Sequence, residues 1–385
     1  MLKQIQTILL RLDLNVPFDK NSNSILETEK IEAVIPEIKK LAEKNKVIVI
    51  SHLGKGEKKD SIRPIAEYIR NKLSKKINDN LTILENTRWL PGETTKENSK
   101  EFLSTSRFLA EMGDKYINDA FAALHRPHAS IIGIPKIFRE EKYKNLNKKN
   151  LINKIQVGQL VKFEIKNLNK NLNKIKKEKT LIILSGSKIS AKLPLIKKFL
   201  INENVRVFVS GGIANQILKD VLNYNIGLSF FEINFQLSAK EKEFLQEKIV
   251  KGRLILPIDV LLQDNQEKHI NAIHLRDRIV DLGRESISTL KSIILENKNI
   301  IFNGPLGIYE EGFTVATKEI LESLKELAIK NQKVLITIGG SDTLIFIKKL
   351  RITSVENIFI STGGGAMLEY LANDGDLPGL KVLQK

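Results

Sequence analysis

Short apolar runs alternate with amphipathic segments along most of the chain. In the first half, the runs end in polar or glycine-containing turns and cover residues 7–17, 46–56, 81–89 and 115–130. Helix-like stretches lie between the first three runs, at residues 28–45 and 60–76. Strands that alternate with amphipathic helices indicate βαβ units and a parallel sheet.

The second half repeats this pattern with a different turn chemistry. Its apolar runs pass from β-branched residues into glycines, at residues 180–190, 205–215, 298–310, 333–343 and 358–367. Several of these runs then enter a helical pattern. The segment between the halves, about 140 to 180, is rich in lysine and asparagine and indicates helix and linker. The pattern therefore predicts a two-lobed α/β protein.

Length and cysteine content narrow the class of protein. A chain of 385 residues suggests two or three domains. The chain has no cysteine, which excludes disulfides and thiolate zinc sites and fits a reducing compartment. The first residues, MLKQIQTILLRLD, become charged too soon for a signal peptide, and no run approaches the roughly 20 apolar residues of a membrane span. We expect a soluble, cytoplasmic protein without a membrane partner.

The formal net charge of +17 raises the question of a polyanionic partner. Lysines are spread along the whole chain, however, and occur with asparagine and isoleucine, as at 144–154 and 166–179. Aromatic residues make up only 6% and do not alternate with the basic runs, as stacking on bases would require. We attribute most of the charge to a solvated surface, and nucleic acid is not the expected partner.

Cations dominate the strand ends of the first half. Ligands of open parallel sheets bind beyond the carboxyl ends of the strands, so the residues after each run should converge. Those residues are Arg11, Asp13, Asn15, His52, Lys55, Arg88, His125, Arg126 and His128. Because like charges repel one another unless an anion is present, the set predicts a small, multiply anionic ligand, such as a phosphate with a carboxylate.

The pair of histidines in HRPH also allows a metal site. His125 and His128 are separated by a proline and lie beside Arg126, which opposes cation binding, and no HExxH helix is present. The anion site is the better interpretation.

Glycine-rich turns of the second half indicate a phosphate site, because their N–H groups can approach phosphate oxygens. Neither a Walker motif nor GxGxxG is present. Lys188 and Lys192 lie one helical turn apart and can face the same polyphosphate. Asp342 can coordinate Mg²⁺ beside phosphates, and it can also cap a helix, because the two roles are compatible. Glu310 either binds ribose hydroxyls or is a surface residue. An anion site and a metal–nucleotide site together suggest phosphoryl transfer.

An ordered set of motifs spans essentially the full chain: RLDLNVP, SHLGKG, LENTRWLPGE, INDAFAALHRPHAS, SGSKISAKL, GGIANQIL, IFNGPLGIYE, GGSDT, STGGGAM and LPGL. In this order they resemble the phosphoglycerate kinase family. The resemblance implies two Rossmann-like lobes, each a parallel sheet flanked by helices, joined by a hinge helix. It places a 3-phosphoglycerate lobe at 1–157, the hinge helix and nucleotide lobe at 158–370, and a tail returning to the first lobe at 371–385.

The same resemblance implies the reaction and its residues. The reaction is reversible phosphoryl transfer between 1,3-bisphosphoglycerate and MgADP, giving 3-phosphoglycerate and MgATP, in a typically monomeric glycolytic enzyme. The glycerate residues are Asp13, Asn15, Lys30, His52, Leu53, Gly54, Lys55, Arg88 and Arg126, with Arg11, His125 and His128 in the surrounding basic patch. The nucleotide residues are Lys188, Lys192, Asn303, Glu310, Gly339, Gly340, Ser341, Asp342 and Thr343, with Asp342 towards Mg²⁺. The residues at the transferring phosphoryl group are Lys30, Lys188, Gly363, Gly364 and Gly365.

The chain departs from the family pattern at several positions. The motif DxRIRAxLPTI reads TEKIEAVIPEI here, so Lys30 replaces an arginine, and Lys55 replaces another in SHLGKG. Lysine keeps the charge but loses the planar fork that contacts two oxygens at once. These changes, with the +17 charge, leave a second hypothesis open: a catalytically weakened family member that acts as a basic binding protein.

Overall fold

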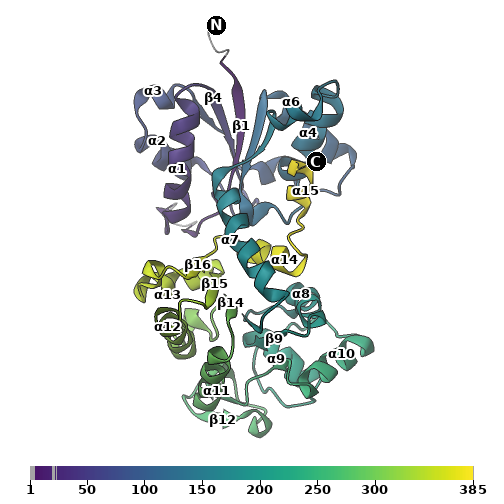
Figure 1. Cartoon of the computed structure of the whole chain (residues 1–385), viewed down its shortest axis with the longest axis vertical. Helices are drawn as coiled ribbons and strands as arrows, with labels where there is room; N and C mark the ends of the chain where they lie inside the picture. The colour runs from purple at the N-terminus through teal and green to yellow at the C-terminus, as the bar shows by residue number, and fades with distance from the viewer. Residues whose placement is uncertain (1–4, 20–21, 23, 385) are drawn as a thin grey trace. The chain divides into compact units, whose positions relative to one another are not determined.

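The computed structural model describes residues 5–19, 22 and 24–384. The chain forms two compact units (Figure 1). Unit 1 contains the residues up to 166 together with those from 376 onward, and unit 2 contains residues 167–375. The first boundary falls inside helix α7 (Gln159–Ile175), so one continuous helix contributes to both units. The resemblance had placed these boundaries at 157 and 370.

A parallel sheet forms the centre of unit 1. Its described strands are β1 (Thr7–Leu12), β4 (Lys46–Ile50), β5 (Leu81–Ile83), β6 (Lys115–Asp119) and β7 (Ile155–Val157). They lie in the order β5-β4-β1-β6-β7, and every neighbouring pair is parallel. In order of appearance this is 3-2-1-4-5, the doubly wound arrangement whose ligand site lies where the order reverses. A short hairpin of β2 (Phe18–Asp19) and β3 (Ser24–Ile25) follows β1.

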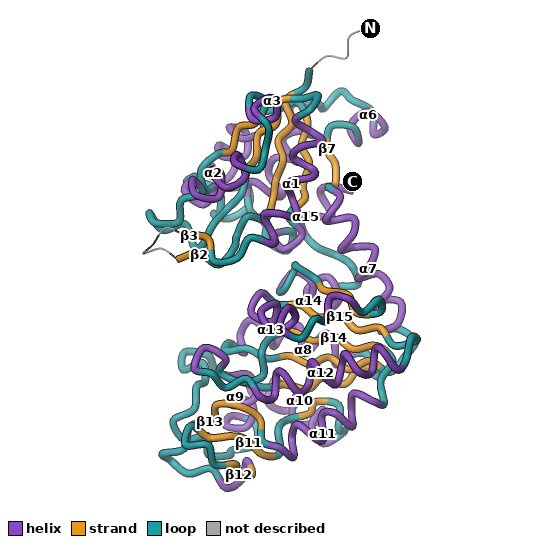
Figure 2. The backbone as a smooth tube through the Cα atoms, turned by 90° about the vertical axis from the view of Figure 1, so that its left-hand side faces the viewer, coloured by secondary structure: helices purple, strands orange, loops and turns teal. Residues whose placement is uncertain are grey.

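Amphipathic helices cover this sheet (Figure 2). They are α1 (Glu29–Ala42), α2 (Arg63–Asn71), α3 (Lys75–Asn78), α4 (Lys100–Glu111), α5 (Ile134–Ile137), α6 (Lys148–Ile152) and α15 (Pro378–Gln384). Helix α1 buries Ile31, Val34, Ile35, Ile38 and Ala42, which recur every three or four residues on one face. This face packs with apolar residues of β1 and β4 in one core.

The carboxyl-terminal helix α15 belongs to unit 1. The N–H of Gly379 donates to the carbonyl of Leu124 at 2.9 Å. A Cβ on Gly379 would lie 2.6 Å from a side-chain carbon of Leu124, so only glycine allows the helix to approach this closely. Leu380 and Leu383 are buried beside it, which ties the end of the chain to the loop after β6.

Unit 2 is built on a larger parallel sheet. Its described strands are β8 (Thr180–Leu184), β9 (Val205–Val209), β10 (Leu254–Ile255), β14 (Asn299–Asn303), β15 (Leu335–Gly339) and β16 (Ile358–Ile360). Their order is β10-β9-β8-β14-β15-β16, which is 3-2-1-4-5-6 by appearance, so the order reverses between β8 and β14. A small antiparallel sheet of β11 (Asp259–Leu262), β12 (Glu267–His269) and β13 (Ile279–Leu282) has a separate apolar cluster.

The helices of unit 2 surround its parallel sheet. They are α8 (Ile189–Ile201), α9 (Gly211–Asp220), α10 (Ala239–Val250), α11 (Arg284–Leu295), α12 (Val315–Lys330), α13 (Leu344–Lys349) and α14 (Gly365–Ala372). Asn171 of α7 is fully buried and bonds to two strands of the sheet, donating to Asn299 Oδ1 at 3.0 Å and accepting from Thr337 Oγ1 at 2.9 Å. These satisfied contacts fix the register of α7 on the sheet.

The hydrophobic pattern predicted the fold class correctly, since each strand-like run contains the beginning of a parallel strand. It did not identify β7, which lies in the lysine-rich segment, or the antiparallel sheet of β11 to β13. Among the residues that the structure describes, no helix combines the length and the apolar character needed to cross a membrane.

Candidate functional site

The carboxyl ends of β1, β4 and β6 lie side by side in unit 1, because these strands are neighbours in the sheet. The strand order reverses between β1 and β6, which makes this edge the expected binding site. The sheet therefore brings the segments that begin at Asp13, at His52 and after Asp119 to one place, although they are far apart in sequence.

Asp13, Asn15, Lys30 and Gly54 form one polar group at this edge. Lys30 Nζ lies 2.9 Å from Asp13 Oδ2 and 3.4 Å from the carbonyl of Asn15. The side-chain oxygen of Asn15 accepts from the N–H of Gly54 at 2.8 Å. Burial opposes ionisation of Asp13, but the Lys30 ammonium holds its pKa below the usual value, so the carboxylate is charged at neutral pH.

The loop after β4 is shaped by Asp60, a buried residue that the sequence analysis did not single out. Its Oδ2 accepts from the N–H groups of Lys55, Gly56 and Glu57, each at 2.9 Å. Gly54 has a φ of +55°, and a Cβ there would lie 2.4 Å from Asp60 Oδ2. The carboxylate thus requires glycine at position 54. In this loop the Lys55 side chain is exposed, whereas Leu53 is buried.

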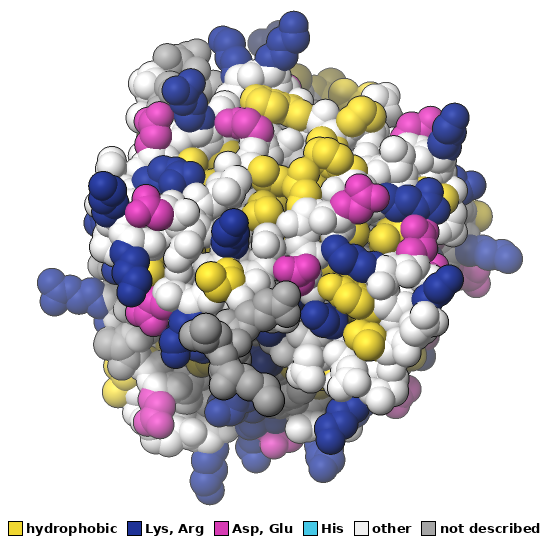
Figure 3. Space-filling model, turned by 90° about the horizontal axis from the view of Figure 1, so that it is seen from above, with side chains coloured by type: hydrophobic (Ala, Val, Ile, Leu, Met, Phe, Trp, Pro, Cys, Tyr) yellow, Lys and Arg dark blue, Asp and Glu magenta, His cyan; other side chains and the backbone are white. Residues whose placement is uncertain are grey.

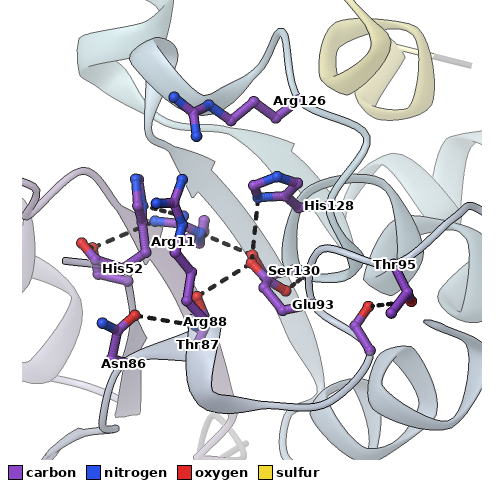
Figure 4. Close-up of polar contacts among 12 residues, drawn as sticks. Arg11, His52, Asn86, Thr87, Arg88, Glu93, Thr95, Arg126, His128 and Ser130 are labelled. Carbon is purple, nitrogen blue, oxygen red and sulfur yellow. Dashed lines mark hydrogen bonds and ion pairs between the residues drawn. The ribbon is translucent and has the colours of Figure 1, made fainter. Parts of the chain in front are cut away.

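Arg88 and Arg126 bring two guanidinium groups to the same region (Figure 4). Burial and the charge of Arg126 lower the pKa of Arg88. Arg88 donates to the carbonyl of Gly54, but its Nε is buried without a partner. Among the described residues, neither arginine forms an ion pair with a carboxylate. Two cations held near each other in this way favour an anionic ligand.

The histidines of this region do not add charge near neutral pH. Burial and the Arg126 guanidinium lower the pKa of His125 to about 4 and that of His128 to about 3. We had expected both to supply positive potential around Arg126. Both imidazoles are instead neutral near pH 7, because a further positive charge beside the arginines is unfavourable.

Arg11 lies beneath the surface of the site. The residue is fully buried, and its guanidinium donates to groups of the protein, including the carbonyl of Leu12 and His52 Nδ1. It therefore contributes to the basic patch from the interior and is not exposed to a ligand.

A cavity of about 500 Å³ opens where the strand order of unit 2 reverses. Its walls are the turns after β8, β9 and β14, with Gly186, Gly211, Gly212 and Gly307 among the lining residues. The half-exposed ring of Phe230 lines the same cavity. A glycine-lined cavity with an aromatic wall suits a planar, partly apolar group such as a nucleobase.

Unpaired donors lie beside this cavity, at the end of β14 and in the turn after β15. The amide Nδ2 of Asn303 and the hydroxyl of Thr343 are buried without a hydrogen-bond partner. Gly340 has a φ of +101°, and a Cβ there would lie 3.2 Å from Thr343 Oγ1 and 3.5 Å from Asn303 Nδ2. Gly340 thus keeps a small space open in front of two donors, as an anion site requires.

Lys192 adds a partly buried cation to these donors. Its Nζ donates to Asn303 Oδ1 at 3.1 Å. Burial lowers the pKa of Lys192 to about 8, an effect that nearby Glu369 opposes. Lys188 occupies the position just before the same helix, makes no capping hydrogen bond and is exposed. A desolvated ammonium beside unpaired N–H and O–H groups is suited to a phosphate.

Glu310 and Asp342 are exposed carboxylates that line the cavity, with Tyr309 nearby. Burial and the charges of Asp342 and Glu310 raise the pKa of Tyr309 to about 12. The neighbouring Ser341 is exposed, and its hydroxyl lies 3.3 Å from Asp342 Oδ1. Among the described residues there is no cluster of three or more protein ligands for a metal. One exposed carboxylate beside a phosphate site nevertheless fits Mg²⁺, which typically takes few protein ligands and several phosphate or water oxygens.

The Gly363 to Gly365 turn lies next to the Gly340 turn. Gly364 begins helix α14 with a φ of +48°, and a Cβ there would lie 3.9 Å from the Cα of Gly340. Around Gly365 nothing would contact a Cβ within 4 Å. This helix start is therefore accessible from the same side as the unpaired donors.

The structure also identifies two residues, Glu93 and Phe230, that were not among the predicted site residues. Glu93 is fully buried behind the basic edge of unit 1, and Phe230 forms a wall of the cavity. Phe230 follows no sheet strand, so no pattern in the sequence marks it. Glu93 lies within the stretch LENTRWLPGE, and its burial could not be read from that motif.

These features define a class: a two-domain α/β kinase, with an anion site on one Rossmann-like unit and a glycine-rich nucleotide cavity on the other. Residues 3–374 match the family model described as phosphoglycerate kinase. The chain belongs to the phosphoglycerate kinase family.

Similar proteins cover nearly the whole chain. The phosphoglycerate kinase of Wolbachia sp. subsp. Drosophila simulans is 30% identical over 99% of this chain and 96% of its own length. That of Coxiella burnetii is 32% identical, with 98% and 95% covered. The solved structure of phosphoglycerate kinase from Coxiella burnetii superposes with a TM-score of 0.72 at 28% identity, covering 100% of this chain and 97% of that structure.

Proposed function

We propose that this protein is an active phosphoglycerate kinase. It transfers a phosphoryl group reversibly between 1,3-bisphosphoglycerate and MgADP, giving 3-phosphoglycerate and MgATP. The observation that supports this most directly is the pair of built sites. In unit 1, Arg88 and Arg126 lie near each other without a carboxylate partner among the described residues, and in unit 2 unpaired donors lie beside Gly340. We further propose that it acts as a cytoplasmic monomer.

In unit 1 the proposed ligand is the glycerate. Its anionic groups would balance Arg88 and Arg126, which lack an acidic partner among the described residues. Asp13 and Asn15 are held by Lys30 and by Gly54, and they present acceptors for hydroxyl groups. The arrangement supports recognition of a small molecule that carries both negative charge and a hydroxyl.

In unit 2 the proposed ligand is the adenine nucleotide. The cavity with Phe230 would hold the base, and Glu310 would accept hydrogen bonds from ribose hydroxyls. Lys192, Asn303 and Thr343 would donate to phosphate oxygens, which would satisfy the buried Nδ2 and Oγ1 atoms that otherwise lack a partner. Asp342 would hold the Mg²⁺ that accompanies the phosphates.

Phosphoryl transfer needs positioning and positive charge rather than a covalent nucleophile. In the direction of ATP synthesis, an oxygen of the β-phosphate of ADP attacks the acyl phosphorus. The bond between that phosphorus and the carboxyl oxygen breaks, which leaves 3-phosphoglycerate. Bound with the nucleotide, Mg²⁺ supplies positive charge to the phosphate oxygens. Lys30, Lys188 and the N–H groups of the Gly363 to Gly365 turn are the proposed contacts of the transferring group.

A coupled assay of ATP formation from 1,3-bisphosphoglycerate and MgADP tests this proposal. We expect turnover in the wild type, loss of detectable activity in Asp342→Ala, and at least roughly a hundredfold decrease in kcat/KM for Arg126→Ala. Lys348→Met, an exposed lysine on α13, serves as the control with unchanged activity. A folded wild-type protein without MgADP-dependent turnover would overturn the proposal.

One face of the molecule gives no support to the basic binding protein. On the face shown in Figure 3, lysine and arginine side chains are interspersed with aspartate and glutamate and do not gather in one continuous patch. This face therefore offers no continuous basic track for a polyanion.

A further inference from the structure

Glu93 is a fully buried acid whose role the ligand sites do not explain. Its carboxylate accepts three hydrogen bonds, from Ser130 N at 2.8 Å, from Ser130 Oγ at 2.6 Å and from Thr87 Oγ1 at 3.2 Å. His128 Nδ1 lies 3.8 Å from Oε1, which is too long for a hydrogen bond. A buried carboxylate is unfavourable unless it is hydrogen-bonded and balanced by a cation.

Burial raises the pKa of Glu93, and the Arg11 charge is the largest effect that opposes this change. The guanidinium is fully buried, and its Nε donates to Ser130 Oγ at 3.1 Å. Because the Ser130 hydroxyl gives its single proton to Glu93, it can only accept from Arg11. Burial lowers the pKa of Arg11, and the charge of Glu93 opposes this change. Figure 4 shows Ser130 and Glu93 together beside the Arg11 side chain.

Arg11 in turn determines the state of His52. Its Nη2 lies 3.0 Å from His52 Nδ1, and a guanidinium can only donate. Nδ1 must therefore be the unprotonated nitrogen of the ring. Burial and the Arg11 charge lower the pKa of His52 well below its usual value, so the ring is neutral and carries its single proton on Nε2.

We infer that Glu93 is a positioning residue that acts on His52 through Ser130 and Arg11. The chain Glu93–Ser130–Arg11–His52 holds the imidazole in the tautomer that offers an N–H to an anionic or hydroxyl oxygen of the ligand. This inference rests on the proposed function, in which His52 contacts the glycerate. Beyond the proposed function, we infer that the Glu93 carboxylate, three contacts away from His52, determines which ring nitrogen of His52 carries the proton.

The tautomer of His52 can be measured in the wild type by the ¹⁵N chemical shifts of its ring nitrogens. The protein has five histidines, and comparison with His52→Gln assigns the signal. We expect a protonated Nε2 and an unprotonated Nδ1. A proton on Nδ1 would overturn the inference, whether or not the protein proves to be a kinase.

Two variants test whether Glu93 acts on His52 through Ser130 and Arg11. Ser130→Ala removes the bridge and keeps both charges, and Glu93→Gln removes the charge. In each we expect a mixture of His52 tautomers and a roughly tenfold to hundredfold increase in KM for 3-phosphoglycerate, with KM for ATP unchanged. Glu93→Asp should recover part of the wild-type values. If Glu93→Gln does not fold, the Ser130→Ala result decides.

Thr87→Val is the matched control. It removes a hydrogen bond from Glu93 but lies outside the chain to Arg11, so the tautomer and both KM values should stay as in the wild type. Wild-type tautomer and KM in Ser130→Ala, or equal changes in Thr87→Val, would show that Glu93 has only a structural role. Absence of kinase activity in the wild type with the expected tautomer would instead contradict the proposed reaction.

Discussion

Replacing Lys192 with methionine should stabilise the protein and weaken nucleotide binding at the same time. Lys192 lies on α8 and donates to Asn303 Oδ1 at 3.1 Å. Burial lowers its pKa from 10.5 to about 8, which means that folding disfavours the charged ammonium. Methionine keeps the apolar length of the side chain and removes the charge.

The magnitude follows from the change in pKa. At about 1.4 kcal/mol per pKa unit, the buried charge costs about 3 kcal/mol at neutral pH. Losing the contact to Asn303 leaves one buried oxygen unpaired, which costs about 1 kcal/mol. We therefore expect Lys192→Met to raise the free energy of unfolding by about 2 kcal/mol. The same substitution removes one charge-assisted hydrogen bond to phosphate and should weaken MgADP binding roughly tenfold to hundredfold.

Two measurements check this reasoning. Urea denaturation gives the stability, and titration calorimetry gives the affinity for MgADP. The stability difference from the wild type should shrink above about pH 8, because the wild-type folded state then loses the buried charge. Lys198→Met, an exposed lysine on the same helix, is the control and should leave MgADP affinity unchanged. Unaltered MgADP affinity together with unaltered or lower stability in Lys192→Met would refute the argument.

Two further predictions concern unit 1. Lys30→Arg should raise kcat up to about tenfold, because a planar guanidinium can contact two oxygens of the transferring group. Steady-state kinetics measures this change. An unchanged or lower kcat would mean that the Lys30–Asp13 pair already serves the reaction as well as an arginine would. Burial raises the pKa of Asp119 to about 6, and its Oδ2 is buried without a hydrogen-bond partner. The folded state therefore favours the protonated Asp119 carboxyl. The stability that this protonated form contributes is fully present below about pH 4 and is lost as the pH rises through about 6. Asp119→Asn should remove about 3 kcal/mol of this pH dependence in urea denaturation, and an unchanged pH profile would contradict the assignment.

Local pattern was sufficient for most strands of the two parallel sheets and for placing several candidate site residues at one sheet edge. Apolar runs that end in polar turns identify β1, β4 and β6, and parallel strands must bring their carboxyl ends to one edge. The grouping of Asp13, His52 and Arg126 follows from this rule without any coordinates. Strand β7 escaped detection because its three residues lie in a lysine-rich segment with no distinct alternation.

Charge states depended on the tertiary structure. His125 and His128 are neutral because burial and Arg126 act on them together, and neither effect can be read from the motif HRPH. The pKa of Lys192 likewise depends on how α8 packs in unit 2. Desolvation and Coulomb interactions depend on distances in space, which sequence separation does not determine.

The sequence by itself determined the fold class, the residues at the two sheet edges and the family of this protein, because strand periodicity and turn chemistry are local properties of the chain. Only the tertiary structure decided which of those residues are exposed at the sheet edge and which are buried beneath it. Arg11 and Ser130 are 119 positions apart, and their contact, together with Glu93, turns Arg11 inward and gives His52 its tautomer. A buried network of this kind arises from the packing of distant segments, so its members carry no common signal in the sequence.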